Sequence, residues 1–226
     1  MDPIFAQTLW VTFKLAFFTT AILTLIGLPF AYWMAYSHFK FKPLVEALVS
    51  MPMVLPPSVI GYYMLVIYSP QNWFGGWLKD VFNIRLAFSF SGVLIASVVF
   101  SLPFMVQPLT NGLRALPTTL REAAYTLGKT KLTTFFKVLL PNIKTSIITA
   151  IALTFAHSIG EFGIVLMVGG SMPGETRVAS IAIYDEVQAI HLAQANQYAF
   201  ILFATSLILL TIIYSVNKSH DTWKMI

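Results

Sequence analysis

Long apolar runs constrain this chain more than any other feature of its sequence. A helix needs about 20 apolar residues to cross the hydrocarbon core of a bilayer. Five runs reach that length, at residues 15–36, 44–68, 88–109, 145–168 and 198–216. Only 10% of the residues are charged, whereas a soluble domain carries about 25%. The sequence therefore predicts an all-α polytopic membrane protein with five transmembrane helices.

Two further segments leave the helix count and the start of the first helix open. Residues 5–14 could extend the first apolar run or form a separate turn at the membrane surface. Residues 177–188 are apolar enough to dip into the membrane as a sixth helix. No long linker, low-complexity tract or internal repeat divides the chain, so we expect a single domain over residues 1–226.

Basic residues are unevenly distributed over the polar segments, and this predicts the orientation. The segments after the first, third and last runs carry Lys40, Lys42, Arg114, Arg121, Lys129, Lys131, Lys137, Lys144, Lys218 and Lys224. The two opposite segments carry only Lys79, Arg85 and Arg177. Because cytoplasmic loops are enriched in Lys and Arg, we expect residues 110–144 and the C-terminus in the cytoplasm and the N-terminus outside. The net charge of +5 then reflects topology and not binding of nucleic acid. The chain has no cysteine, which excludes disulfides and thiolate metal sites.

The segment 110–144 contains a short amphipathic helix. Pro117 is expected to end the preceding helix, and Thr119 and Glu122 have the spacing of a capping box. Gly128 lies where a helix C-terminus favours a residue with positive φ. An apolar stripe is predicted along Leu116, Leu120, Ala123 and Leu127. A helix this short is marginal alone, so the stripe packs either on its own bundle or the lipid surface, or on a partner protein.

Prolines interrupt the second apolar run. Pro52, Pro56, Pro57 and Gly61 fall near its middle, and each proline removes a backbone hydrogen-bond donor. Such breaks are tolerated at membrane depth only where protein or a water-filled cavity satisfies the backbone. We therefore expect either a kinked helix without further purpose or a segment that lines a path through the membrane.

Two ionisable residues, His157 and Glu161, lie four positions apart in the fourth run. Intramembrane ionisable groups are functional candidates by default, here as a proton relay, a metal half-site or a pair lining a path. A mutually satisfied structural pair is the alternative. A metal site is disfavoured because the other histidines, His38, His191 and His220, fall in separate segments without ligand spacing. The outer segment 169–177 reads as a surface turn, in which Glu175 and Arg177 are charged and Arg177 could steer an anion.

Several motifs together resemble one transporter family. Glu122-Ala-Ala-Tyr-Thr-Leu-Gly128, followed after nine residues by Val138-Leu-Leu-Pro141, resembles the EAA loop of permease subunits in bacterial ABC importers. Leu55-Pro-Pro-Ser-Val-Ile-Gly61, Gly-Glu161-Phe-Gly and Pro-Gly-Glu175-Thr-Arg177 are similar to stretches of molybdate or tungstate permeases. Sulfate and thiosulfate permeases share the EAA loop and are the alternative.

The resemblance implies the fold of a type I ABC importer permease and specific roles for the marked residues. It implies that Glu122, Ala123, Ala124 and Gly128 form a coupling helix that docks on an ATPase. The implied path residues are Pro56, Pro57, Ser58, Gly61, His157 and Glu161, and Glu175 and Arg177 would lie in the periplasmic loop.

The implied partners are a second copy of the chain, two cytoplasmic ATP-binding subunits, a periplasmic or lipid-anchored oxyanion-binding protein and the lipid bilayer of the bacterial inner membrane. No cofactor is expected, and the chain itself is not expected to be an enzyme. A proton-coupled secondary carrier is less favoured, because it would normally need inverted repeats and paired buried charges. A membrane enzyme would need a nucleophile or metal constellation that the sequence does not show.

Overall fold

The computed structural model describes residues 3–221, and in this part of the chain it contains helices and no β-strand. The elements in chain order are α1 (Pro3–Tyr36), α2 (Lys42–Ser50), η1 (Met51–Met53), α3 (Pro57–Tyr68), α4 (Trp73–Phe82), α5 (Phe90–Ala115), α6 (Thr118–Thr126), α7 (Lys131–Thr134), η2 (Phe135–Leu139), α8 (Leu140–Asn142), α9 (Lys144–Gly160), α10 (Gly163–Gly169), α11 (Ala179–Gln188) and α12 (Leu192–Asp221). Here η1 is a 3₁₀-helix and η2 is a π-helix. The predicted all-α class is confirmed, and Lys224 lies outside the described residues.

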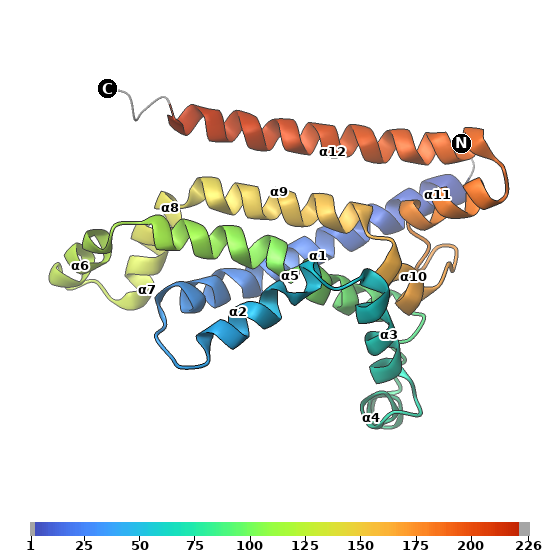
Figure 1. Ribbon diagram of the computed structural model, residues 1–226, viewed down its shortest axis with the longest axis horizontal. Coiled ribbons are helices and arrows are strands. Elements are labelled where there is room, and N and C mark those ends of the chain that lie inside the picture. The colour runs from blue at the N-terminus through green and yellow to red at the C-terminus, as the bar shows by residue number, and fades with distance from the viewer. Residues whose placement is uncertain (1–2, 222–226) are drawn as a thin grey trace.

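The long helices α1, α5, α9 and α12 lie alongside one another (Figure 1). Helix α5 packs on both α1 and α9, and α12 packs on α9. Helices α6 and α7 lie at one end of this arrangement, which we call the α6 end, and α11 lies at the other (Figure 1). Helices α3 and α4 project sideways from the bundle, nearer the α11 end.

Up to five membrane crossings are present by length and composition. Helices α1 and α5 and the Leu192–Ser215 part of α12 each suffice alone. Two bent pairs could each be one broken span: Lys42–Met53 with Pro57–Tyr68, bent by 106°, and Lys131–Asn142 with Lys144–Gly160, bent by 77°. Residues 5–14 extend the first helix, since α1 begins at Pro3. Helix α11 has 10 residues, about 15 Å at 1.5 Å per residue, so the suggested sixth crossing is not present.

The buried core is divided into two main clusters along the bundle. Nearer the α11 end, residues of α1 and α5 meet α10; members include Leu15, Val93, Ala96, Ile164 and Val168. Nearer the α6 end, the same two helices meet η2 and the start of α9; members include Leu23, Met105, Leu109, Leu139 and Ile143. Apolar residues buried in both halves of α1 and α5 thus hold the long helices together along their length.

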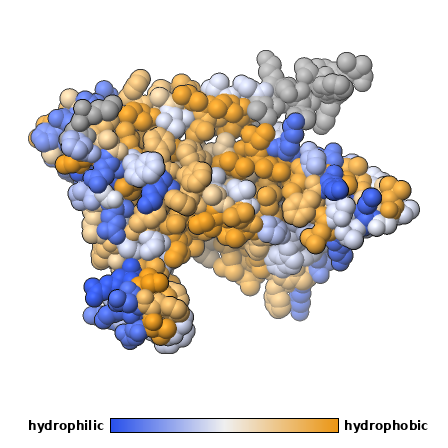
Figure 2. Space-filling model, turned by 180° about the vertical axis from the view of Figure 1, so that it is seen from behind, coloured by the Kyte–Doolittle hydropathy of each residue, from blue (hydrophilic) through white to orange (hydrophobic). Residues whose placement is uncertain are grey.

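The outer surface is itself apolar over a broad belt. Viewed from behind, hydrophobic residues cover most of the middle of the molecule, and hydrophilic residues gather toward the two ends (Figure 2). Only 11% of the apolar window of α12 is buried, and its exposed side chains include Phe200, Phe203 and Leu207. An apolar surface of this extent fits a bilayer environment.

Candidate functional site

The polar segment between α5 and α9 begins with α6, which follows directly on Pro117. Pro117 is the N-cap, with φ −57° and ψ 136°, and no side chain caps the helix. The helix starts at Thr118, so Thr119 already lies inside it. The predicted capping box between Thr119 and Glu122 is therefore wrong. The physical reason is Pro117, which cannot continue α5 and starts α6 two residues earlier than the capping pattern requires, because that pattern would place the N-cap at Thr119.

Helix α6 ends in a turn that depends on Gly128. The Gly128 N–H donates to the carbonyl of Tyr125 (2.9 Å), and the Lys129 N–H donates to the carbonyl of Ala124 (3.0 Å). This pair of bonds is the Schellman motif. Gly128 has φ +73°, as the sequence predicted. A Cβ at this position would meet nothing within 4 Å, so glycine is required by backbone conformation and not by space.

Most of α6 is exposed. Glu122 and Ala123 are exposed, whereas Ala124 is 5% exposed and packs inward. The predicted apolar stripe is divided: Leu116 packs against the core, but Leu127 is 75% exposed. The far end of the stripe therefore has no packing partner within the described part of the chain.

The segment that follows α6 anchors it to the bundle. Phe135, Leu139 and Ile143 are buried in the core cluster of the α6 end. In the same segment, Leu132 and Phe136 are 71% and 61% exposed. Helix α6 contacts both α7 and η2. The exposed apolar side chains of Leu132 and Phe136 therefore lie in a segment that its buried residues fix to the core.

The second span is broken between Met53 and Pro57, as its prolines predicted. Pro56 is the N-cap of α3 with an extended backbone, φ −55° and ψ 136°, and Pro57 is its first residue. Pro56, Pro57 and Ser58 are exposed, and Val54 is 82% exposed. Irregular backbone at membrane depth must face protein or water, and the described part of the chain does not cover this break.

Gly61 has a different role from its neighbours. It is buried, and a Cβ there would lie 2.7 Å from the Cβ of Met167 on α10. Gly163 in turn lies against Pro57, at 2.9 Å from a notional Cβ. The expectation that Gly61 lines a path is not met in this structure, because the close approach of α3 and α10 places it between two helices.

Glu161 is buried in a polar cluster and does not lie on a helical face with His157. Helix α9 ends at Gly160, and Glu161 is its C-cap with an extended backbone. The residue is 4% exposed. Its carboxylate accepts hydrogen bonds from the hydroxyls of Ser97 and, at 2.7 Å, Ser101. The expectation that Glu161 lines a path is therefore not met here, since both oxygens are turned inward to α5.

His157 lies beside this cluster. Its Nε2 atom is 3.8 Å from a carboxylate oxygen of Glu161, and its ring stacks on Phe104 with centroids 3.9 Å apart. The 3.8 Å separation is too long for a hydrogen bond, and Nε2 of His157 is buried without a hydrogen-bond partner in the described part of the chain. The expectation of a mutually satisfied pair is therefore not met. No group of three or more His, Cys, Asp or Glu among residues 3–221 could hold a metal ion. Sequence reasoning missed Ser97 and Ser101; their i, i+4 spacing on one helix is the available signal.

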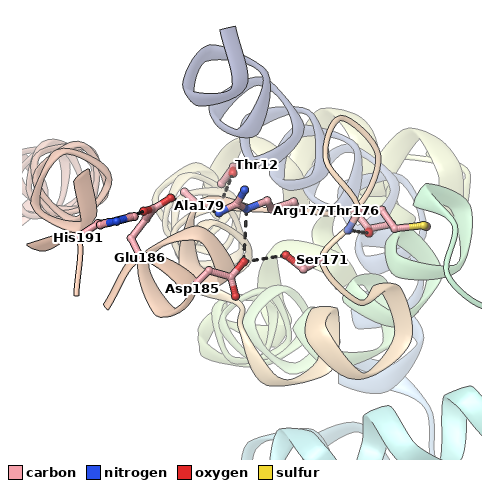
Figure 3. Close-up of polar contacts among 9 residues, drawn as sticks. Thr12, Ser171, Thr176, Arg177, Ala179, Asp185, Glu186 and His191 are labelled. Carbon is pink, nitrogen blue, oxygen red and sulfur yellow. Dashed lines mark hydrogen bonds and ion pairs between the residues drawn. The ribbon is translucent and has the colours of Figure 1, made fainter. Parts of the chain in front are cut away.

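The outer turn 169–177 is tied to α11 by charge (Figure 3). The Arg177 guanidinium lies 3.5 Å from both Asp185 and Glu186, and Asp185 also accepts a hydrogen bond from Ser171. Glu175 is exposed. Two carboxylates balance the charge of Arg177, so the suggestion that it steers an anion is not supported by its surroundings.

Comparisons with known proteins agree with this architecture. Residues 27–221 match the family model described as "Binding-protein-dependent transport system inner membrane component". The chain is 40% identical to the molybdenum transport system permease protein ModB of Azotobacter vinelandii over 92% of both chains. It is 34% identical to the sulfate transport system permease protein CysT of Synechocystis sp., over 93% of this chain and 73% of that one.

Solved structures of ABC importers share the fold. A chain of the MetNI methionine ABC transporter in an inward-facing conformation has a TM-score of 0.74 at 18% identity, covering 97% of this chain and 98% of that one. A chain of a bacterial alginate ABC transporter has a TM-score of 0.75 at 16% identity, covering 96% and 78%. The chain therefore belongs to the family of binding-protein-dependent transport system inner membrane components, with the fold of an ABC importer permease.

Proposed function

We propose that this chain is the single-domain permease subunit of an ATP-driven importer that carries molybdate or tungstate into the cytoplasm. The identity to the molybdenum permease covers 92% of both chains. By contrast, CysT of Synechocystis sp. is less similar, and 73% of its length is covered. The sulfate or thiosulfate importer therefore remains the second candidate.

The observation that carries the proposal is the exposed helix α6, which packs on a segment anchored in the core by Phe135 and Leu139. Glu122, Ala123 and Leu127 are free to contact a partner, and Gly128 fixes the turn that presents them. Small residues permit close approach, and the exposed apolar end of the stripe gains from burial. We assign this surface to a cytoplasmic ATP-binding subunit, two of which would serve a complex containing two copies of the chain.

The translocation path is proposed to run between the two copies beside the break in the second span. Pro56, Pro57 and Ser58 are exposed there, at a depth where backbone must face protein or water. A second copy and an aqueous path would together supply that cover. His157, Glu161 and Gly61 support this region from within the protomer.

The proposed orientation can be tested separately from the substrate. It rests on the excess of Lys and Arg in the segments of the α6 end, which places residues 110–144 in the cytoplasm. Because the chain has no native cysteine, Thr130→Cys and Gly170→Cys can each be labelled in intact cells. We expect an impermeant maleimide to reach Gly170→Cys only. Labelling of Thr130→Cys from outside would reverse the assignment.

The substrate is tested by deleting the gene. We expect the activity of molybdenum-dependent enzymes to fall in low-molybdate medium and to recover with excess molybdate. A deletion that leaves these enzymes unchanged and creates a requirement for another sulfur source would instead support the sulfate importer.

A further inference from the structure

An open apolar groove runs along α1 toward the α6 end. Its first part, about 430 Å³, lies between α1 and α9 and begins at Phe17 and Phe155. Its second part, about 390 Å³, lies between α1 and the α7–η2 segment and reaches Tyr32. Both parts are lined by Thr24 and Leu25, so they are continuous. From Phe17 to Tyr32 the helix rises about 22 Å, more than the ~15 Å half-thickness of a bilayer core.

A polar cavity of about 420 Å³ adjoins the groove at its α6 end and shares Tyr32 and Lys131 with it. Arg121 also lines this cavity, with its guanidinium 4.5 Å from the centre of the Tyr36 ring. Within the described part of the chain, neither cation forms an ion pair with a carboxylate. Glu122 is the one acid in the lining, so the cavity carries two positive charges against one negative charge.

We propose that the groove and the cavity together hold one anionic phospholipid. An acyl chain would lie along α1, and the phosphate would lie between Arg121 and Lys131. The two unpaired cations favour a net-negative headgroup, as basic pockets beside transmembrane helices do. The inference requires that the chain is membrane-embedded, and its assignment to the cytoplasmic leaflet rests on the proposed orientation. It requires neither the proposed substrate nor the ATPase.

A second copy of the chain fits this groove less well. To neutralise Arg121 and Lys131, the second copy would have to place carboxylates next to them. Of the described side chains at the α6 end, the acids are Glu122, already in the cavity, and Glu46, which pairs with Arg114 at 2.5 Å. A lipid supplies the missing negative charge together with the apolar chain.

The headgroup is tested by native mass spectrometry of the purified full chain titrated with phosphatidylglycerol or phosphatidylcholine. We expect tighter binding of phosphatidylglycerol and a loss of about fivefold in affinity for each cation removed in Arg121→Gln/Lys131→Gln. The control Lys129→Gln/Lys137→Gln removes the same charge from exposed residues outside the two cavities and should bind as the native chain does. Equal losses in both double variants would overturn the proposal.

The groove is tested in the same assay. Leu25→Trp, which fills it, should lower phosphatidylglycerol binding severalfold, whereas Leu207→Trp on the exposed face of α12 should not. Displacement of the lipid by millimolar inorganic phosphate would show a site for a free anion and contradict the proposal. Spontaneous disulfide dimers of Leu25→Cys in membranes would show that a second copy covers the groove, and would also contradict it.

Discussion

Gly128 and Glu161 each lie just after the end of a helix. Gly128 acts there through its backbone conformation, and Glu161 acts through its side chain. Gly128 adopts φ +73° and closes the turn after α6. Glu161 turns its carboxylate inward to hydroxyls of α5 after α9 ends. Both residues are marked in the sequence, but only the geometry separates a residue that shapes an exposed surface from one that is bonded within the interior.

Gly128→Val should weaken assembly with the ATP-binding subunit. A β-branched residue in the left-handed region costs about 1–2 kcal/mol, so the turn and the helix it presents would shift. Gly128→Asn is the matched control, because asparagine tolerates that region and a side chain there meets open space. Co-purification of the two subunits measures the effect. Equal assembly in both variants would show that the turn does not set the docking surface.

Glu161→Ala should destabilise the protein. It removes the acceptor for Ser97 and Ser101. Ser101 keeps its hydrogen bond with Ser158, but the buried Ser97 hydroxyl is left unpaired, at a cost of about 1–3 kcal/mol. Thermal unfolding in detergent, followed by intrinsic fluorescence, measures it. Glu175→Ala, the same change at an exposed position, should leave the midpoint almost unchanged. Similar midpoints for the two variants would argue against a structural role for the buried carboxylate.

At the scale of elements, two short helices that follow breaks pack on each other. Helix α3 follows the proline break of the second span, and α10 follows the break after α9. Gly61 and Gly163 allow their close approach. The pair is therefore a unit whose internal packing depends on these glycine contacts.

Gly61→Ala should disturb this unit. The added Cβ would lie 2.7 Å from the Cβ of Met167, which cannot swing away, and overpacking of this kind costs about 1–3 kcal/mol. Gly160→Ala is the control, since a Cβ there meets nothing within 4 Å. We expect a lower unfolding midpoint for the first variant only. If the two substitutions shift the midpoint equally, the packing argument fails.

Local sequence predicted which elements exist better than how they meet. The apolar runs identified the crossings, the prolines marked the break before α3, and Gly128 marked the turn after α6. The 106° bend could not be predicted, because proline only permits a break, whereas the angle depends on the fit of Gly61 against α10. The partners of Glu161 were missed because Ser97 lies 64 positions earlier, beyond any local pattern.

At the scale of the whole molecule, the candidate surfaces lie at opposite ends of the long helices. Helix α6 is exposed at one end, and the outer turn with α11 lies at the other (Figure 1). The exposed break of the second span precedes both of them in the chain and needs a cover. In the proposed importer, the ATPase would act at the first end, the oxyanion-binding protein would deliver at the second, and two copies would enclose the path.

The central claim is tested most directly by uptake into proteoliposomes. The chain would be reconstituted with its co-expressed ATP-binding subunit and supplied with the cognate binding protein and labelled molybdate. We predict molybdate uptake that requires internal ATP, resists excess sulfate and falls severalfold in Glu122→Ala. Uptake of labelled sulfate in place of molybdate, or molybdate uptake that continues without ATP, would contradict the account.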